Sequence, residues 1–293
     1  MKPYLRIQTL KIALALFILL AISFSCISKA NKASSGESSE VLTLIDEPYG
    51  ADAFQKMDVY LVANRSEQTP LVILIHGGGW GAGDKKDANF MKDLLAPHNM
   101  NVININYRLA TETTIHCDSI IKDINAAMLY INANSEKWKI RKDNYVFWGG
   151  SAGAHLALLY AYKYDTKNLV SSVITLGAPT KLNEPSIFKN GAEGRLYLLT
   201  GQVWKNDTLD QDFIRVSPYY GDHFKPSLLV YGEADSIVPF AQSVMLGNKL
   251  TKSGISNQVF PLPNGGHGGE GTSPEVLGIL NETMLGWIAK YSK

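Results

Sequence analysis

The chain has 293 residues, of which 45% are hydrophobic and 19% are charged. This composition is that of an ordinary globular protein with enough apolar residues for one sizeable core. The 28 basic residues nearly balance the 27 acidic ones, which leaves a net charge of +1. A balance of this kind argues against the strongly basic surface of a nucleic-acid-binding protein.

The first 25 residues have the pattern of a secretory signal peptide. Basic residues between Lys2 and Lys11 precede an apolar run at 12–22, which is followed by Ser-Phe-Ser at 23–25. A charged head, a short apolar run and small residues, in this order, are typical of such signals. The apolar run is shorter than the roughly 20 residues that a membrane-spanning helix needs. We therefore expect residues 1–25 to be removed on export.

Cys26 stands at the expected cleavage point and resembles the lipobox of bacterial lipoproteins, in which a cysteine becomes the first mature residue and carries acyl chains. Ser23 occupies a position where that motif usually has leucine, so an ordinary signal peptidase site is the alternative. Residues 26–40 are rich in Ser, Lys and Ala, which predicts a flexible tether. We expect a lipoprotein anchored to the membrane of a bacterial cell envelope, or otherwise a periplasmic or secreted protein.

The second cysteine, Cys117, is the only other one in the chain. With Cys26 outside the fold, no disulfide is expected. Free cysteines are usually buried as small hydrophobic residues, and we expect this role for Cys117.

From Val41 onward, strand-like and helix-like segments alternate. The segment at 57–62 alternates apolar and polar residues, which suits an antiparallel pair, whereas the aliphatic run at 71–75 suits a strand covered on both faces of a parallel sheet. Strands are predicted at 41–44, 57–62, 71–75, 102–107, 145–148, 172–176, 227–231 and 258–260, and helices at 89–96, 115–133, 155–162, 240–252 and 274–291. This order predicts an α/β domain over residues 41–293, with a mostly parallel sheet and helices on both faces.

The segment at 179–219 interrupts the alternation, since it has no clear aliphatic strand. We interpret it as an insertion over the carboxyl ends of the strands, where open α/β sheets form their binding sites. A surface excursion without functional consequence is the alternative.

Two glycine-rich motifs carry the chemistry. Gly149-Gly150-Ser151-Ala152-Gly153 lies between a predicted strand and a predicted helix, and G-x-S-x-G in this setting is a nucleophile elbow. Only residues with little or no side chain fit two positions before and after a serine held on so tight a turn. The second motif, His76-Gly77-Gly78-Gly79, follows the strand at 71–75, and its backbone N–H groups could hold the oxygen of a tetrahedral intermediate.

Together these motifs resemble the α/β-hydrolase superfamily, in its esterase and lipase group. The stretch from His76 to Lys85, with Asn106-Tyr107-Arg108-Leu109 and the elbow, is similar to bacterial esterases grouped with bifunctional acetylxylan and feruloyl esterases. The resemblance extends from about Val41 to the C-terminus and implies the α/β-hydrolase fold. Related enzymes include kynurenine formamidases, so the resemblance alone does not identify the substrate.

The resemblance also implies the catalytic residues, which follow each other in the order serine, acid, histidine. Ser151 would be the nucleophile and His267, between glycines after the last predicted strand, the general base. Asp235 matches the position of the acid, and Glu233 is its nearest rival. The oxyanion hole would consist of the N–H groups of Gly78, Gly79 and Ala152.

Four nearby residues have less specific roles. Trp80 is expected to line the substrate pocket, and a core tryptophan is the equal alternative. We expect Asp84 to cap the next helix or to anchor the glycine loop through a salt bridge, and Arg108 to be structural. His155 is expected to pack within the fold. These four residues are at positions 80, 84, 108 and 155 of the sequence.

The sequence contains no H-E-x-x-H motif and no paired Cys/His spacing, and it calls for neither a metal nor a cofactor. We predict a serine carboxylesterase that acts on a small or carbohydrate-linked acyl ester, with no nucleic-acid partner and with oligomeric state undetermined. A peptidase or formamidase with the same triad is the alternative, followed by an inactive hydrolase fold that serves as a binding module.

Overall fold

The computed structural model describes residues 40–190, 192–205 and 207–293. The predicted signal peptide, Cys26 and all of the predicted tether except Glu40 lie outside these residues. No helix in the described part of the chain is both long and apolar enough to cross a membrane.

Within the described residues, an eight-stranded sheet organises the fold, with the strand order β1-β2-β4-β3-β5-β6-β7-β8. The first two strands pair antiparallel with each other, and β2 pairs antiparallel with β4, whereas all other neighbours are parallel. The strands are β1 Leu42–Pro48, β2 Lys56–Leu61, β3 Leu71–Ile75, β4 Asn101–Ile105, β5 Tyr145–Gly150, β6 Val170–Leu176, β7 Ser227–Gly232 and β8 Asn257–Leu262. The α/β-hydrolase architecture predicted from the motifs is therefore present.

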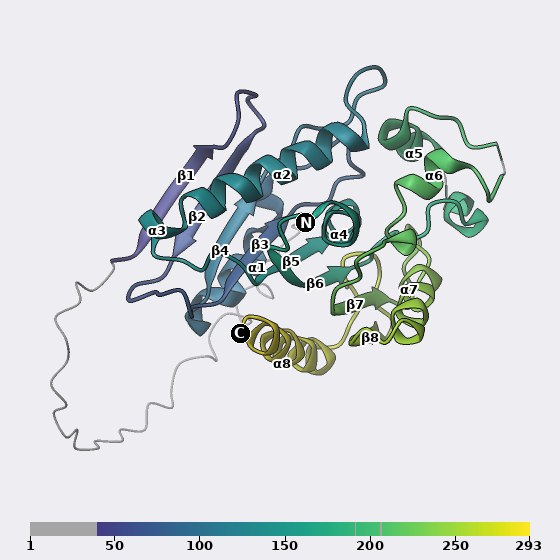
Figure 1. Ribbon diagram of the computed structural model, residues 1–293. Coiled ribbons are helices and arrows are strands. Elements are labelled where there is room, and N and C mark those ends of the chain that lie inside the picture. The colour runs from purple at the N-terminus through teal and green to yellow at the C-terminus, as the bar shows by residue number, and fades with distance from the viewer. Residues whose placement is uncertain (1–39, 191, 206) are drawn as a thin grey trace, which may run out of the picture. The chain divides into compact units, whose positions relative to one another are not determined.

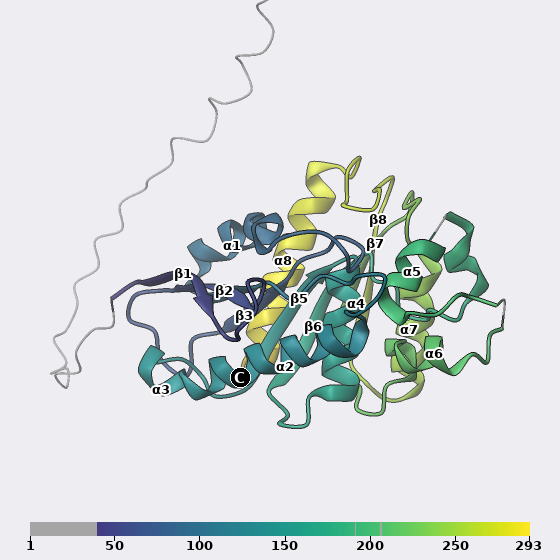
Figure 2. The same cartoon turned by 90° about the horizontal axis from the view of Figure 1, so that it is seen from above.

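Helices cover both faces of this sheet. The α-helices of the described residues are α1 Asn89–Leu95, α2 Cys117–Ala133, α3 Ser135–Trp138, α4 Ala152–Leu159, α5 Glu193–Thr200, α6 Gln211–Arg215, α7 Ala241–Lys252 and α8 Pro274–Tyr291. Of these, α5 and α6 belong to the segment at 179–219 and lie beyond the end of the sheet (Figure 1). Figure 1 shows α2 and α4 on one side of the sheet and α8 on the other, and Figure 2 shows α1 beside α8.

The apolar core lies in two layers because side chains alternate between the faces of a strand. In β3, Ile73 packs into the layer of α2, α4 and α7, and its neighbours Val72 and Leu74 pack into the layer of α1 and α8. All five residues of β3 are buried, which confirms the interpretation of the aliphatic run at 71–75.

Several predicted boundaries change. The helix predicted at 155–162 begins directly after Ser151 and ends at Leu159, followed by a π-helical turn at Tyr160–Tyr164. The predicted helix at 115–133 begins at Cys117, whose side chain is buried. Burial raises the pKa of the Cys117 thiol to about 12, so the expected structural role of this cysteine is confirmed.

Candidate active site

Ser151 occupies the tight turn between β5 and α4. Its φ is +53° and its ψ is −121°, a conformation that residues with a side chain rarely adopt. A Cβ on Gly149 would lie 2.5 Å from the carbonyl group of Gly153, and a Cβ on Gly153 would lie 2.1 Å from the carbonyl oxygen of Ile75. The backbone thus requires glycine at both positions, and it holds the serine hydroxyl clear of the sheet.

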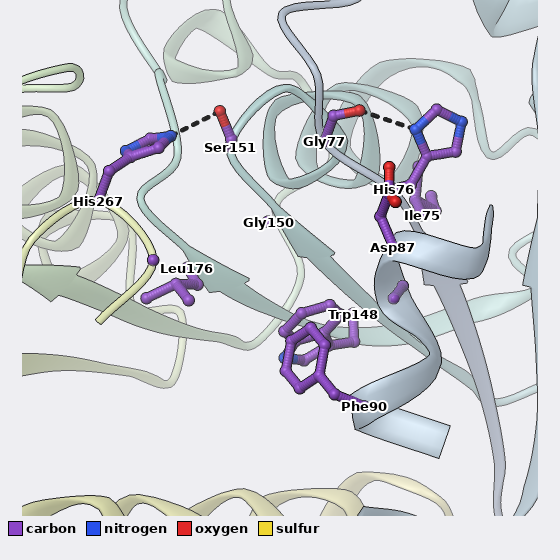
Figure 3. A pocket seen from close by; sticks show the side chains of 12 residues that line it. Ile75, His76, Gly77, Asp87, Phe90, Trp148, Gly150, Ser151, Leu176 and His267 are labelled. Carbon is purple, nitrogen blue, oxygen red and sulfur yellow. Dashed lines mark hydrogen bonds between the residues drawn. The ribbon is translucent and has the colours of Figure 1, made fainter. Parts of the chain in front are cut away.

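His267 reaches this hydroxyl from the loop after β8. Its Nε2 lies 2.8 Å from Ser151 Oγ, and its Nδ1 lies 2.7 Å from Asp235 Oδ2. Figure 3 shows the ring of His267 directed at Ser151. Because a carboxylate only accepts hydrogen bonds, Nδ1 carries the proton and Nε2 is free to accept the serine proton. The structure therefore brings Ser151, His267 and Asp235 into one hydrogen-bonded chain.

The loop after β7 fixes Asp235 in this chain. Its second oxygen, Oδ1, accepts the backbone N–H groups of Ile237 and Val238 at 2.8 and 2.9 Å. The side chain of Asp235 is only 1% exposed, whereas the rival candidate, Glu233, is exposed. Of these two acids, Asp235 is the one that contacts the histidine.

Gly177, directly after β6, is a site residue that the sequence reasoning missed. Its φ is +62°, and a Cβ there would lie 3.1 Å from Cε1 and Nδ1 of His267 and 3.3 Å from Asp235 Oδ2. The absence of a side chain leaves room for the histidine and the aspartate to meet. The only signal in the sequence was a glycine at the carboxyl end of a predicted strand.

The glycine loop after β3 runs against the elbow. A Cβ on Gly77 would lie 3.4 Å from Ser151 Cβ. Positive φ values of 111°, 58° and 63° at Gly78, Gly79 and Trp80 turn the backbone back on itself. In the described part of the chain, the N–H groups of Gly78, Gly79 and Ala152 donate to no protein acceptor. They are therefore available to an oxygen bound next to Ser151.

Two aromatic rings anchor the start of this loop. The ring of His76 stacks on that of Tyr107, with 4.3 Å between ring centroids and 7° between planes. The hydroxyl of Tyr107 donates to the carbonyl of His76 at 2.9 Å, and His76 Nδ1 donates to the carbonyl of Gly77 at 2.7 Å. Burial lowers the pKa of His76, which favours the neutral ring. These contacts hold the loop in place beside the elbow.

Comparison with known proteins is consistent with this geometry. The sequence profile of the family described as BD-FAE matches residues 57–250, a range that includes the glycine loop, the elbow and Asp235. The chain belongs to the BD-FAE family. The match ends before His267, which only the structure brings to the other two side chains.

Relatives of this BD-FAE member include enzymes named for different reactions. A kynurenine formamidase of Danio rerio is 31% identical over 117 residues, which are 40% of this chain and 38% of the relative. Esterase LipQ of Mycobacterium tuberculosis is 24% identical over 238 residues, which are 76% of this chain and 56% of that esterase. The chain thus spans well under half the length of the formamidase that it matches.

Solved structures give the same fold. A truncated carbohydrate esterase from gut microbiota superposes with a TM-score of 0.72 at 22% identity, covering 88% of this chain and 98% of that chain. An inhibited form of esterase B from Lactobacillus rhamnosis superposes with a TM-score of 0.67 at 25% identity, covering 86% and 87% of the two chains.

Two cavities meet at Ser151 in this member of the BD-FAE family. The larger, of about 220 Å³, is lined by Ser151, His267, Leu176 and the aromatic pair Phe90 and Trp148, among others. Phe90 on α1 is 58% exposed and meets Trp148 edge to face at 5.5 Å. Figure 3 shows the two rings next to each other and apart from Ser151 and His267.

The smaller cavity, of about 30 Å³, lies on the other side of Ser151. It is lined by Gly79, Trp80 and Ala152 together with residues of the segment at 179–219, among them Ile187 and Arg195. The segment at 179–219 thus lies next to Ser151, where the sequence predicted an insertion.

Trp80 has both of the roles that the sequence left open, since it lines a pocket and packs in the core. It lines the smaller cavity, but it is only 5% exposed, and its indole Nε1 donates to Nδ1 of His155 at 3.1 Å. The Nε2 of His155 in turn donates to the carbonyl of Val216 at 2.7 Å. Trp80 therefore ties the glycine loop to α4 and, through His155, to the segment after α6.

The remaining polar residues near the loop are structural. Asp84 caps the short 3-10 turn at Lys85–Ala88, as expected. The salt bridge offered as its alternative role is absent among the described residues. Arg108 pairs with buried Asp123, with Nε and Nη2 at 2.8 and 2.6 Å from the carboxylate, which confirms its structural role.

Proposed function

We propose that the protein is a serine carboxylesterase that forms an acyl-enzyme on Ser151. The observation that carries this proposal is the hydrogen-bonded chain from Ser151 through His267 to Asp235, next to N–H groups that have no acceptor among the described residues. A serine hydroxyl is a weak nucleophile by itself, and a neutral imidazole nitrogen at hydrogen-bond distance is the usual way to activate it.

In the first half of the reaction, Oγ of Ser151 attacks the ester carbonyl carbon while Nε2 of His267 takes the hydroxyl proton. Negative charge then develops on the carbonyl oxygen, which receives hydrogen bonds from the N–H groups of Ala152 and the glycine loop. The protonated His267, stabilised by Asp235, returns the proton to the departing alcohol. The products of this step are the free alcohol and an ester of Ser151.

In the second half, water takes the place of the alcohol. His267 accepts a proton from the water as its oxygen attacks the acyl-enzyme, and it then returns this proton to Oγ of Ser151. The acid is released and the free serine is restored. Each half uses the same base and the same oxyanion donors, so one arrangement of residues serves both.

The substrate is proposed to be an ester of a small acyl group with a larger alcohol that carries a ring. The difference in volume between the two cavities at Ser151 supports this choice. Half-exposed Phe90, backed by Trp148, offers an apolar surface on which an aryl group or a sugar ring can lie. The named carbohydrate esterase among the structural neighbours is a further reason to test sugar esters.

A formamidase is the second candidate, because the relative with 31% identity carries that name. A formyl group is smaller than any other acyl group, and an arylamine leaving group would use the same aromatic surface. The same triad could cleave the amide, provided that His267 protonates the leaving nitrogen.

The decisive experiment compares purified wild-type protein with Ser151→Ala on p-nitrophenyl acetate, a formanilide and an amino-acid anilide. We expect a burst of nitrophenol with wild type, equal to the enzyme concentration, and a loss on the order of 10⁶-fold in kcat for the variant. Preferred cleavage of the formanilide would favour a formamidase. Preferred cleavage of the amino-acid anilide would favour a peptidase. Equal rates for wild type and Ser151→Ala would refute the acyl-enzyme, and no turnover by wild type would favour a binding module.

A further inference from the structure

The direction of proton transfer assigns a role to each cavity, if the proposed acyl transfer at Ser151 holds. The leaving oxygen has to lie within hydrogen-bond reach of Nε2 of His267, because that nitrogen supplies its proton. The larger cavity is lined by both Ser151 and His267, whereas the smaller is lined by Ser151, Ala152 and Gly79 without His267. The alcohol therefore occupies the larger cavity and the acyl chain the smaller.

Helix α5 forms the outer wall of this acyl cavity and is firmly seated. Leu196 and Leu199 are 1% and 0% exposed, and the carbonyl of Leu198 accepts a hydrogen bond of 2.8 Å from Nδ1 of His116. The side chain of Leu198 also packs over the glycine loop, since a Cβ on Gly81 would lie 3.0 Å from its Cδ1. Side chains three residues apart share one face of a helix. Arg195, three residues before Leu198, therefore faces the glycine loop as well.

The side chain of Arg195 covers the glycine loop. Its Cδ, Nε and Cγ would lie 3.0, 3.4 and 3.5 Å from a Cβ on Gly79, so the aliphatic stem lies directly over this loop. The residue is exposed, and within the described residues its guanidinium makes no hydrogen bond or ion pair. Long basic side chains often cover apolar surface with the stem while the charged end stays in water.

We propose that Arg195 determines acyl-chain specificity by closing the outer end of the acyl cavity with its stem. The remaining volume of about 30 Å³ is room for roughly two or three water-sized groups, which fits acetyl or propionyl. Longer chains would have to displace the stem from Gly79. The chemistry at Ser151 does not involve Arg195, so its replacement changes which acyl group is accepted rather than how it is transferred.

The test is the ratio of kcat/KM for p-nitrophenyl hexanoate to that for the acetate, in four proteins. Wild type sets the baseline. Arg195→Ala removes the stem and the charge, Arg195→Met keeps an unbranched stem without the charge, and Glu193→Ala is the matched control on an exposed position of α5 outside the cavity lining. Thermal unfolding of each protein checks that it is folded.

We expect Arg195→Ala to raise the hexanoate-to-acetate ratio about tenfold, because each further buried methylene contributes to binding. Arg195→Met and Glu193→Ala should stay within about twofold of wild type. An unchanged ratio in Arg195→Ala would overturn the proposal. A ratio in Arg195→Met equal to that in Arg195→Ala would also overturn it, because closure would then depend on the guanidinium. If wild type hydrolyses no ester, the proposed function itself fails, a result that is distinct from an unchanged ratio.

Discussion

Acidification should destabilise the protein through one buried histidine. His155 is 0% exposed and lies between the indole of Trp80 and the carbonyl of Val216. A second proton on this ring would go to Nδ1, which faces the indole N–H and would lose its hydrogen bond. Burial is the main reason that the pKa of His155 falls to about 4, although the hydrogen bond to Val216 opposes this shift.

The size of the effect follows from the two pKa values of His155. The unfolded chain binds a proton at this histidine below about pH 6.5, whereas the folded protein binds it only below about pH 4. Between these values the unfolded state holds more protons, so the free energy of unfolding falls as the pH decreases. At 1.36 kcal/mol per pH unit, the full loss is roughly 3 kcal/mol, of which about 2 kcal/mol occurs between pH 7 and pH 5.

The assay is urea unfolding of wild type and of His155→Gln at pH 7 and pH 5. Glutamine does not titrate, yet its amide can accept from Trp80 and donate to Val216. Other titrating groups, such as buried His76, are common to both proteins and cancel in the comparison. We expect wild type to lose about 2 kcal/mol more than the variant over this interval. Equal losses in the two proteins would show that His155 is not held neutral in the folded state.

Three further predictions concern the site and the lipid anchor predicted at Cys26. Gly177→Ala should lower kcat on the order of tenfold with little change in KM, because φ is +62° and the new Cβ would press on His267. An unchanged kcat would contradict the close contact between Gly177 and His267. Phe90→Ala should raise KM for aryl esters about threefold to tenfold, because edge-to-face and stacking contacts contribute about 0.5–1.5 kcal/mol. KM for ethyl acetate, which has no ring, should stay unchanged. Equal effects on both substrates would argue against an aromatic subsite. Cys26→Ala should move the protein from the membrane fraction to the soluble fraction on cell fractionation, and retention in the membrane would exclude anchoring through this cysteine.

Much of the fold could be predicted because its signals are local. The aliphatic run at Leu71–Ile75 is β3 at the predicted bounds, and the helix predicted at 274–291 is α8 at the predicted bounds. The start of α8 is marked by Ser273, whose hydroxyl accepts the N–H of Val276, and by a proline at the first helical position. Such capping depends only on neighbouring residues, so the sequence alone is sufficient for it.

Other features were missed because local signals oppose the structure that forms. The start of α4 contains Gly153, a residue that disfavours helix by itself, and α4 begins earlier than the helix predicted at 155–162. The turn at Ser151 overrides this preference, because Gly153 has to lie against the carbonyl oxygen of Ile75. The π-helical turn that follows α4 has no signature in the hydrophobic pattern.

The candidate site divides in the same way. The sequence by itself determined the elbow at Ser151 and the glycine loop, because both depend on steric rules between residues a few positions apart. Only the tertiary structure decided that Gly177 makes room for His267 and that Arg195 covers Gly79. These contacts join segments far apart in the chain, and the sheet, rather than any local preference, sets the distances between them.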